Sequence, residues 1–207
     1  MTLYHPQIFD TPDDVAARAI ILTPEGESTE SRWERETPYL ASLVRAHCET
    51  KRVLDFGCGI GRMASALLVD PGVTCVAGID TSADMRRMAE EAVADERFAA
   101  FDPGMLAPTQ AFDTALMVWV LQHVFDPVLE VARVRAFLKP GGRLFIVNNI
   151  RRAVPVTDTT TLHWLDDGFD VRALLKAAFR EIEYGTLSSD HMPAVLVENA
   201  FWGVYER

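Results

Sequence analysis

Residues 53–62 have the sequence VLDFGCGIGR, and this stretch decides the fold of the chain. A short apolar run that ends in closely spaced glycines is typical of a buried strand turning sharply into a helix, because glycine accepts backbone angles that other residues avoid. The first amides of such a helix are free to bind a ligand. The sequence therefore predicts a strand–loop–helix unit that binds a cofactor, with a loop built from Gly57, Cys58, Gly59 and Gly61.

The residues around this loop favour an amino-acid tail over a pyrophosphate as the ligand. The glycine spacing is Gly-x-Gly-x-Gly, whereas dinucleotide-binding loops have Gly-x-Gly-x-x-Gly. Asp55 lies just before the first glycine, where a carboxylate would repel a pyrophosphate but would accept hydrogen bonds from a cationic amine. We therefore expect the loop to hold the zwitterionic end of its ligand.

A second carboxylate, Asp80, follows the next predicted strand, 19 residues after Gly61. In nucleoside-binding Rossmann folds an acid at this place accepts hydrogen bonds from the ribose hydroxyls. The alternative is that Asp80 only begins the following helix, near Ser82. Because the glycine loop lies upstream, we prefer the ribose-binding interpretation.

Strands and helices alternate outward from the loop. Apolar runs predict strands at residues 51–56, 73–79, 98–101, 112–118, 143–148, 181–185 and 195–205. Helical spacing predicts helices at residues 35–48, 62–69, 82–94, 127–138 and 168–179. We also expect a short helix capped by Thr11, a capping pair of Thr81 and Asp84, and a long loop at residues 149–167.

This alternation predicts an α/β fold, a Rossmann-like and mostly parallel seven-stranded sheet with helices on both faces. The last two strands are joined by residues 186–193, which suit an antiparallel connection better than a crossover. One antiparallel strand should therefore lie near the edge of the sheet.

Together these segments resemble the class I S-adenosylmethionine-dependent methyltransferases, from about Arg52 to Asn149. Residues 54–61 are similar to the first motif of that family, residues 112–118 and 121–124 to its fourth strand and the turn after it, and residues 138–144 to the turn into its fifth strand. The resemblance implies one methyltransferase domain over residues 1–207. Its parts would be an N-terminal lid (1–50), a cofactor-binding half (51–149), and an acceptor-side loop with the C-terminal strands (150–207).

The resemblance also implies the ligand and the residues that hold it. The cofactor would be S-adenosylmethionine, with S-adenosylhomocysteine as product. Asp102, after the third strand, would meet the adenine amino group. The full cofactor set is Asp55, Gly57, Cys58, Gly59, Gly61, Asp80, Thr81, Met85, Asp102, Val118 and Trp119.

Two histidines are candidate general bases, because histidine accepts a proton near neutral pH. His123 follows the fourth strand, and His163 lies in the long loop beside Trp164. The alternatives, which we favour, are that His123 shapes the turn beside the cofactor and that His163 is an ordinary loop residue. A base is not essential, because the methyl group is already electrophilic and the enzyme's main task is positioning.

The acceptor should lie over the carboxyl ends of the fourth and fifth strands, where open α/β sheets bind ligands. The candidate acceptor contacts are Trp33, Asn148 and Trp164. Trp33 or Tyr39 could instead pack the N-terminal helix on the sheet. Arg151 and Arg152 could hold an acidic acceptor, although a solvated loop is the simpler interpretation.

Charge and composition narrow the partners. The formal net charge of −10 opposes nucleic-acid binding, and the fourth strand is not followed by the Asn/Asp-Pro-Pro-aromatic motif of enzymes that methylate nucleobase amines. Neither the histidine spacing nor the strand ends predict a metal site, and the longest apolar stretch is too short to span a membrane. Three cysteines without a Cys-x-x-Cys pair, and a start unlike a secretory signal, favour the cytoplasm.

We therefore predict S-adenosylmethionine-dependent methyl transfer to a small-molecule acceptor by in-line displacement. One alternative is an S-adenosylmethionine-binding module without catalysis. Another is a nicotinamide-dependent oxidoreductase, which the glycine spacing and the lack of a Tyr-x-x-x-Lys pair oppose. The sequence leaves open the acceptor, the methylated atom and the oligomeric state.

Overall fold

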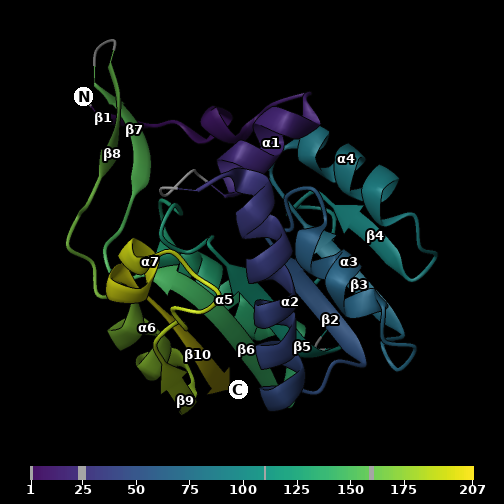
Figure 1. The fold of residues 1–207 in the computed structure, drawn as a ribbon. Helices are drawn as coiled ribbons and strands as arrows, with labels where there is room; N and C mark the ends of the chain where they lie inside the picture. Colours follow the sequence, from purple (N-terminus) through teal and green to yellow (C-terminus); the bar gives the residue numbers. More distant parts are fainter. Residues whose placement is uncertain (1, 23–26, 110, 159–160) are drawn as a thin grey trace.

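The computed structural model describes residues 2–22, 27–109, 111–158 and 161–207. Its main sheet has seven strands in the order β4-β3-β2-β5-β6-β10-β9 (Figure 1). Their bounds are β2 (Arg52–Phe56), β3 (Cys75–Ile79), β4 (Phe98–Phe101), β5 (Phe112–Val118), β6 (Leu138–Asn149), β9 (Arg180–Gly185) and β10 (Ala200–Glu206). Strand β10 is antiparallel to both of its neighbours, and the other pairs are parallel. The predicted mostly parallel sheet, with one antiparallel strand near its edge, is confirmed.

Helices cover both faces of this sheet. They are α1 (Asp14–Ile21), α2 (Thr29–His47), α3 (Arg62–Leu68), α4 (Ala83–Val93), α5 (Pro127–Phe137), α6 (Val171–Ala178) and α7 (Ala194–Asn199). Successive strand residues point to opposite faces. Val53 therefore joins the core beneath α2 and α3, and Leu54 joins the core beneath α5 and α6. In the part of the chain that the structure describes, no helix has the length and apolar character needed to cross a bilayer.

A second sheet of three short strands lies beside the main one (Figure 1). It consists of β1 (Thr2–Tyr4), β7 (Val154–Asp158) and β8 (Thr161–Leu165), paired antiparallel in the order β1-β7-β8. The prediction of an irregular loop over residues 149–167 was therefore wrong. The local sequence does not identify β7 as a strand, because β7 pairs with β1 at the other end of the chain.

The N-terminal segment crosses the carboxyl edge of the main sheet. From β1 it passes through the 3-10 helix η1 (Pro6–Phe9) to α1, the purple path along the top of Figure 1. The ring of Phe9 lies 5.4 Å from that of His123, in the turn after β5. The chain thus brings its first helical turns over the ends of the central strands.

Four helix starts differ from the prediction, and one of them is α6, which begins at Val171 instead of residue 168. Asp13 caps α1 in place of Thr11, because its carboxylate accepts hydrogen bonds from two amides of the first turn. Ser82 caps α4 in place of Thr81, and its hydroxyl accepts a hydrogen bond from Met85 N. Helix α2 begins at Thr29, six residues earlier than predicted, after the cap Ser28.

The last strand is shorter than predicted. Residues 195–199 belong to α7, and β10 begins only at Ala200. Ala200 pairs with Asn149, the last residue of β6. Residues before Ala200 therefore have no strand to pair with, and the apolar run at Val195 forms a helical turn after Pro193.

Candidate cofactor and acceptor site

The glycine loop lies between β2 and α3 at the carboxyl edge of the sheet. Gly57, Gly59 and Gly61 have backbone φ angles of +76°, +53° and +79°, a left-handed region that glycine enters without strain. The amide of Gly57 donates a hydrogen bond to Ile79 O at 2.7 Å, and the amide of Gly59 donates to Asp80 Oδ2 at 2.9 Å. These bonds attach the loop to the end of β3.

Asp80 therefore joins the loop to the next helix. Its second oxygen, Oδ1, accepts a hydrogen bond from Ser82 N at 3.0 Å. Burial raises the pKa of the Asp80 carboxyl, although hydrogen bonds from Ser82 and Gly59 act against that rise. The geometry is compatible with both interpretations of Asp80, as a ribose-binding acid and as the acid that begins the helix.

Asp55 is the buried acid beneath the loop. Its side chain is 3% exposed, and among the described residues its Oδ2 atom has no hydrogen-bond partner. Burial raises the pKa of Asp55 to about 7, although the nearby Arg62 lowers it. A buried carboxylate of this kind is stabilised by a cation, so the residues present fit the amine of an amino-acid ligand.

Cys58 fills the space between the loop and β3. A Cβ atom on Gly78 would lie 2.8 Å from Cys58 Sγ, so glycine is needed there to seat this side chain. Burial raises the pKa of the Cys58 thiol well above its ordinary value. Cys58 is therefore a protonated packing residue in this structure.

Three further predicted cofactor residues, Thr81, Met85 and Asp102, lie near this loop. Thr81 is exposed after Asp80, and Met85 is buried in an apolar cluster that also contains Ile60. Asp102 Oδ2 lies 3.7 Å from Arg86 Nη1 on α4. The structure thus places all of them on the side of the loop that faces β3 and α4.

Apolar side chains lie directly against the glycines. A Cβ atom on Gly57 would lie 2.4 Å from Val120 Cγ2, and one on Gly59 would lie 2.8 Å from Ile21 Cδ1. A ligand that approaches Gly59 from the side where a Cβ would lie must therefore displace the Ile21 side chain. Open hollows of about 400 Å³ and 410 Å³ lie instead along α2, the first beside Trp33 and the second beside Tyr39.

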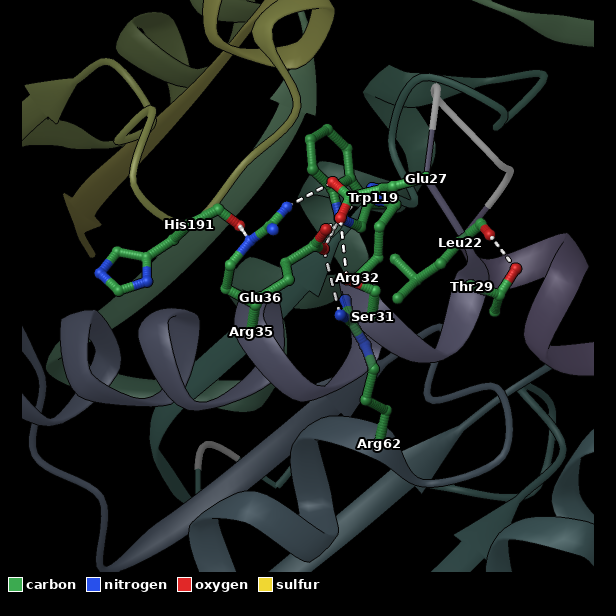
Figure 2. Close-up of polar contacts among 10 residues, drawn as sticks. All are labelled: Leu22, Glu27, Thr29, Ser31, Arg32, Arg35, Glu36, Arg62, Trp119 and His191. Carbon is green, nitrogen blue, oxygen red and sulfur yellow. Dashed lines mark hydrogen bonds and ion pairs between the residues drawn. The ribbon is translucent and has the colours of Figure 1, made fainter.

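Val118 is the last residue of β5, and Trp119 begins the turn after it. Val118 is half-buried, and Trp119 has a φ angle of +61°, which is unusual for a large side chain. The Trp119 amide donates to Val147 O at 2.8 Å, and the indole Nε1 donates to Glu36 Oε1 at 2.7 Å. Glu36 was not predicted as a site residue, and it lies on α2, where Figure 2 shows it surrounded by donors.

His123 uses both ring nitrogens in contacts with the protein. Nδ1 lies 2.6 Å from Ala153 O and donates to it. Nε2 lies 3.2 Å from Gln122 Nε2, which is the donor, because Gln122 Oε1 already accepts a hydrogen bond from Asn149 N. Burial lowers the pKa of His123, so the neutral ring is favoured. Asn148 is fully buried near this turn, and its side-chain oxygen accepts a hydrogen bond from the backbone amide of Gln122 at 2.9 Å.

Three aromatic rings meet at this edge. His123 lies 5.4 Å from Trp164, and Phe9 lies 6.3 Å from Trp164, between ring centroids. His163 is the neighbour of Trp164 on β8, so its side chain points to the opposite face of that strand. The rings of His123 and Trp164 therefore lie close together, as predicted for the acceptor side, and the ring of Phe9 lies beside them. The side chain of His163 points away from this group.

Trp33 lies apart from this group, on α2. The guanidinium of Arg18 stacks over its ring at 4.7 Å, and that of Arg62 lies at 5.7 Å. Its apolar neighbours are in the cluster that contains Met85 and Ile60. Trp33 thus packs where α1 and α2 meet, beside the glycine loop rather than beside Trp164.

The two arginines after β6 have different surroundings. Arg152 is buried and donates to Asp167 Oδ2 at 3.2 Å and to Leu121 O at 3.3 Å. Arg151 is 85% exposed and lies 3.8 Å from Asp166. In the residues that the structure describes, no group of three or more histidine, cysteine, aspartate or glutamate side chains could hold a metal ion.

The fold and this site together define a class of protein. The sequence profile of the family described as "Methyltransferase domain" matches residues 27–192, which is most of the chain. The chain therefore belongs to that family, and its fold is that of the class I S-adenosylmethionine-dependent methyltransferases.

Curated relatives match about half of the chain. The ubiquinone biosynthesis O-methyltransferase of Thiobacillus denitrificans is 36% identical over 122 residues, which are 53% of this chain and 49% of that protein. The tRNA U34 carboxymethyltransferase of Hydrogenovibrio crunogenus is 30% identical over 124 residues, which are 56% of this chain and 36% of that protein. The matched part spans half or less of the length of these relatives.

The similarity of fold extends over nearly the whole chain. The crystal structure of the N-methyltransferase NodS from Bradyrhizobium japonicum WM9, in complex with S-adenosylhomocysteine, aligns with a TM-score of 0.61 at 16% identity. The alignment covers 94% of this chain and 99% of that one. At this level of identity the likeness concerns the fold alone.

Proposed function

We propose that this chain transfers a methyl group from S-adenosylmethionine to a small-molecule acceptor by in-line displacement. The observation that carries the proposal is Asp55, buried beneath a left-handed glycine loop, with an oxygen that lacks a partner among the described residues. Leaving a buried carboxylate unpaired is costly. The amine of the cofactor's amino-acid tail supplies the cation that Asp55 requires.

The residues around Asp55 would hold the rest of the cofactor. Asp80 would accept hydrogen bonds from the ribose hydroxyls, with Thr81, Met85 and Asp102 on the adenine side and Val118 and Trp119 beside the sulfur. The bound cofactor supplies a methyl carbon that its sulfonium makes electrophilic. This orientation is supported by the loop itself, because the amide of its central residue, Gly59, donates to Asp80 and the loop is followed directly by Arg62.

The chain's own contribution is then to orient the acceptor and to keep water away from it. Phe9, His123 and Trp164 form the aromatic wall nearest the carboxyl ends of β5 and β6. Correct orientation of two reacting groups corresponds to effective concentrations of up to ~10⁵–10⁸ M. Because both nitrogens of His123 are engaged, we propose that His123 shapes this wall instead of accepting a proton.

We propose a small molecule as the acceptor rather than a nucleic acid. The net charge of −10 would repel a phosphate backbone, which basic proteins bind by displacing counterions. The relatives' names do not decide the matter, since one concerns ubiquinone biosynthesis and another tRNA. Cys48, Cys58 and Cys75 are all unpaired, which supports a reducing compartment such as the cytoplasm.

Isothermal titration calorimetry tests the cofactor assignment. The protein should bind S-adenosylmethionine or S-adenosylhomocysteine at about one per chain, and NAD and NADP much more weakly. Binding of a nicotinamide dinucleotide without binding of either sulfur compound would overturn the proposal. Formation of S-adenosylhomocysteine with a panel of small aromatic and acidic acceptors then separates an enzyme from a module that only binds the cofactor.

A further inference from the structure

A buried ionic cluster connects α2 to the two loops of the cofactor site (Figure 2). Its centre is Glu36, whose side chain is fully buried. Glu36 Oε1 accepts hydrogen bonds from Trp119 Nε1 at 2.7 Å and from Arg62 Nη1 at 3.1 Å. Glu36 Oε2 accepts one from Arg32 Nη2 at 2.8 Å. One carboxylate therefore binds donors from three different segments of the chain.

The carboxylate of Glu36 is ionised in this setting. Burial alone would raise its pKa, but the guanidiniums of Arg62 and Arg32 and the hydrogen bond from Trp119 lower it overall. Buried ion pairs seldom stabilise a fold more than apolar side chains of the same size would. The geometry that the cluster fixes is therefore a better explanation for it than stability.

Two of the three donors belong to the loops that surround the cofactor. Trp119 begins the turn after β5 in a left-handed conformation, and its neighbour Val120 packs on Gly57. Arg62 is the first residue of α3, directly after the glycine loop, and its charge lowers the pKa of Asp55. A shift of Glu36 would therefore move the groups on both sides of the cofactor.

Helix α2 is itself fixed at several points. The hydroxyl of Thr29 donates to Leu22 O at 3.1 Å, which ties α2 to the end of α1. Arg35 donates to His191 O at 3.2 Å and forms an ion pair with Glu27 (Figure 2). The helix that carries Glu36 is thus attached to the N-terminal segment and to the C-terminal loop, so it is a firm support for the cluster.

From this arrangement we propose that Glu36 is a positioning residue of the cofactor site. Glu36 holds the turn at Trp119 and the end of the glycine loop at Arg62 to one point on α2. It thereby fixes the distance between these two segments, which lie on either side of the proposed cofactor. The inference rests on the proposed cofactor site. It predicts that breaking either hydrogen bond to Glu36 weakens cofactor binding in a protein that remains folded.

The test measures the Kd of S-adenosylhomocysteine by calorimetry in Glu36→Gln, Trp119→Phe and the double variant. The loss of a hydrogen bond to a charged group corresponds to at most about a hundredfold in an equilibrium constant. Because the bond acts on the ligand only through positioning, each single variant should weaken binding by roughly three- to thirtyfold, within that limit. Both changes weaken the bond between Trp119 and Glu36, and Glu36→Gln also weakens the pairing with Arg62 and Arg32. The double variant should therefore bind about as weakly as Glu36→Gln alone. Trp119→Phe leaves Glu36 paired with both arginines, so it keeps the test valid if Glu36→Gln does not fold.

Two control variants separate positioning from general stability. Glu34→Gln changes an exposed carboxylate on the same helix and should leave the Kd unchanged. Leu40→Ala opens a cavity in the core beneath α2, so it should lower the Tm while the Kd stays the same. The inference is overturned if folded Glu36→Gln and Trp119→Phe bind as the unaltered protein does, if their effects add, or if Leu40→Ala weakens binding equally. Failure of the unaltered protein to bind the ligand at all would instead overturn the proposed function, and this inference with it.

Discussion

The proposed cofactor side and the proposed acceptor side of this molecule are built in opposite ways. On the cofactor side, β2, the glycine loop, α3 and β3 follow one another within residues 52–79, and the bond from Gly59 to Asp80 closes the unit. On the acceptor side, Phe9, His123 and Trp164 come from three segments far apart in the chain. Local sequence therefore determines the glycine-loop part of the first region, and tertiary packing determines the second.

The two regions also differ in how tightly they are packed. The glycines of the loop meet neighbouring side chains so closely that added Cβ atoms would overlap them, and Asp55 is 3% exposed. Trp164 is 49% exposed, and Leu162 on the same face of β8 is 40% exposed. Substitutions should thus have steep effects on the cofactor side and graded ones on the acceptor side, and four predictions test this contrast.

Gly57→Ala should have the largest effect. The new Cβ would need a left-handed backbone and would overlap Val120, which together should cost about 2–4 kcal/mol of unfolding free energy. Binding of S-adenosylhomocysteine should be lost. Gly168→Ala is the matched control, since Gly168 has a φ of +70° in open space and should cost only about 1 kcal/mol. Equal losses in the two variants, measured by denaturant titration, would contradict the packing argument.

Asp80→Ala should weaken cofactor binding by about ten- to a hundredfold, because hydrogen bonds to a charged acceptor are lost. The protein should remain folded, as judged by circular dichroism. Asp84→Ala, four residues on in the first turn of α4, is the control and should bind normally. Unchanged affinity in a folded Asp80 variant would show that this acid serves only the start of the helix.

The contrast also explains what could be predicted from the sequence. The seven strands, their order of appearance and the glycine loop all follow from local signals, namely apolar runs, glycine spacing and an acid at a strand end. The antiparallel β10 was predicted from a connection of residues 186–193, and its direction is confirmed, although the structure shows a longer connection of residues 186–199 that contains α7. Each of these signals involves only residues that are close in the sequence, so each can be recognised without a structure.

The remaining features depend on contacts between distant segments. Strand β7 pairs with β1 near the other end of the chain, so neither strand has a local signal strong enough to identify it. Glu36 and Arg32 are spaced as an ion pair on a helix, but α2 was predicted to begin at residue 35, beyond Arg32. A helix start at Ser28, followed by this pair, was the signal that could have drawn attention to Glu36.

The pH dependence of Asp55 sharpens the contrast further. Burial raises its pKa from 3.8 to about 7, so the folded protein keeps a proton that the unfolded chain releases above about pH 4. The free protein should therefore lose stability as the pH rises from about 4 to about 7. Asp55→Asn should be more stable than the unaltered protein at about pH 8 and equal to it near pH 4, in thermal melts.

Cofactor affinity should change in the opposite sense. Binding of a cationic amine requires the ionised carboxylate, so below its pKa Asp55 must release a proton, and affinity should rise roughly tenfold per pH unit up to about pH 7. Titrations with S-adenosylhomocysteine between about pH 5.5 and about pH 8 measure this slope. In Asp55→Asn the slope should vanish and binding should be weak throughout. A slope that persists in that variant would assign the proton to another group.

The smallest effect is expected on the acceptor side, at His163. The side chain of His163 points away from the rings of Phe9, His123 and Trp164. His163→Ala should therefore keep turnover of an identified acceptor within about twofold of the unaltered protein. Loss of a general base would instead lower turnover by roughly 10²–10⁴-fold. His123→Ala removes the hydrogen bonds to Ala153 and Gln122 and should lower stability and acceptor affinity together. Measuring turnover, acceptor KM and Tm for both variants separates the two histidines. A large fall in turnover for His163→Ala, with Tm and cofactor Kd unchanged, would mean that β8 presents the opposite face to the acceptor and that the acceptor side is as sharply built as the glycine loop.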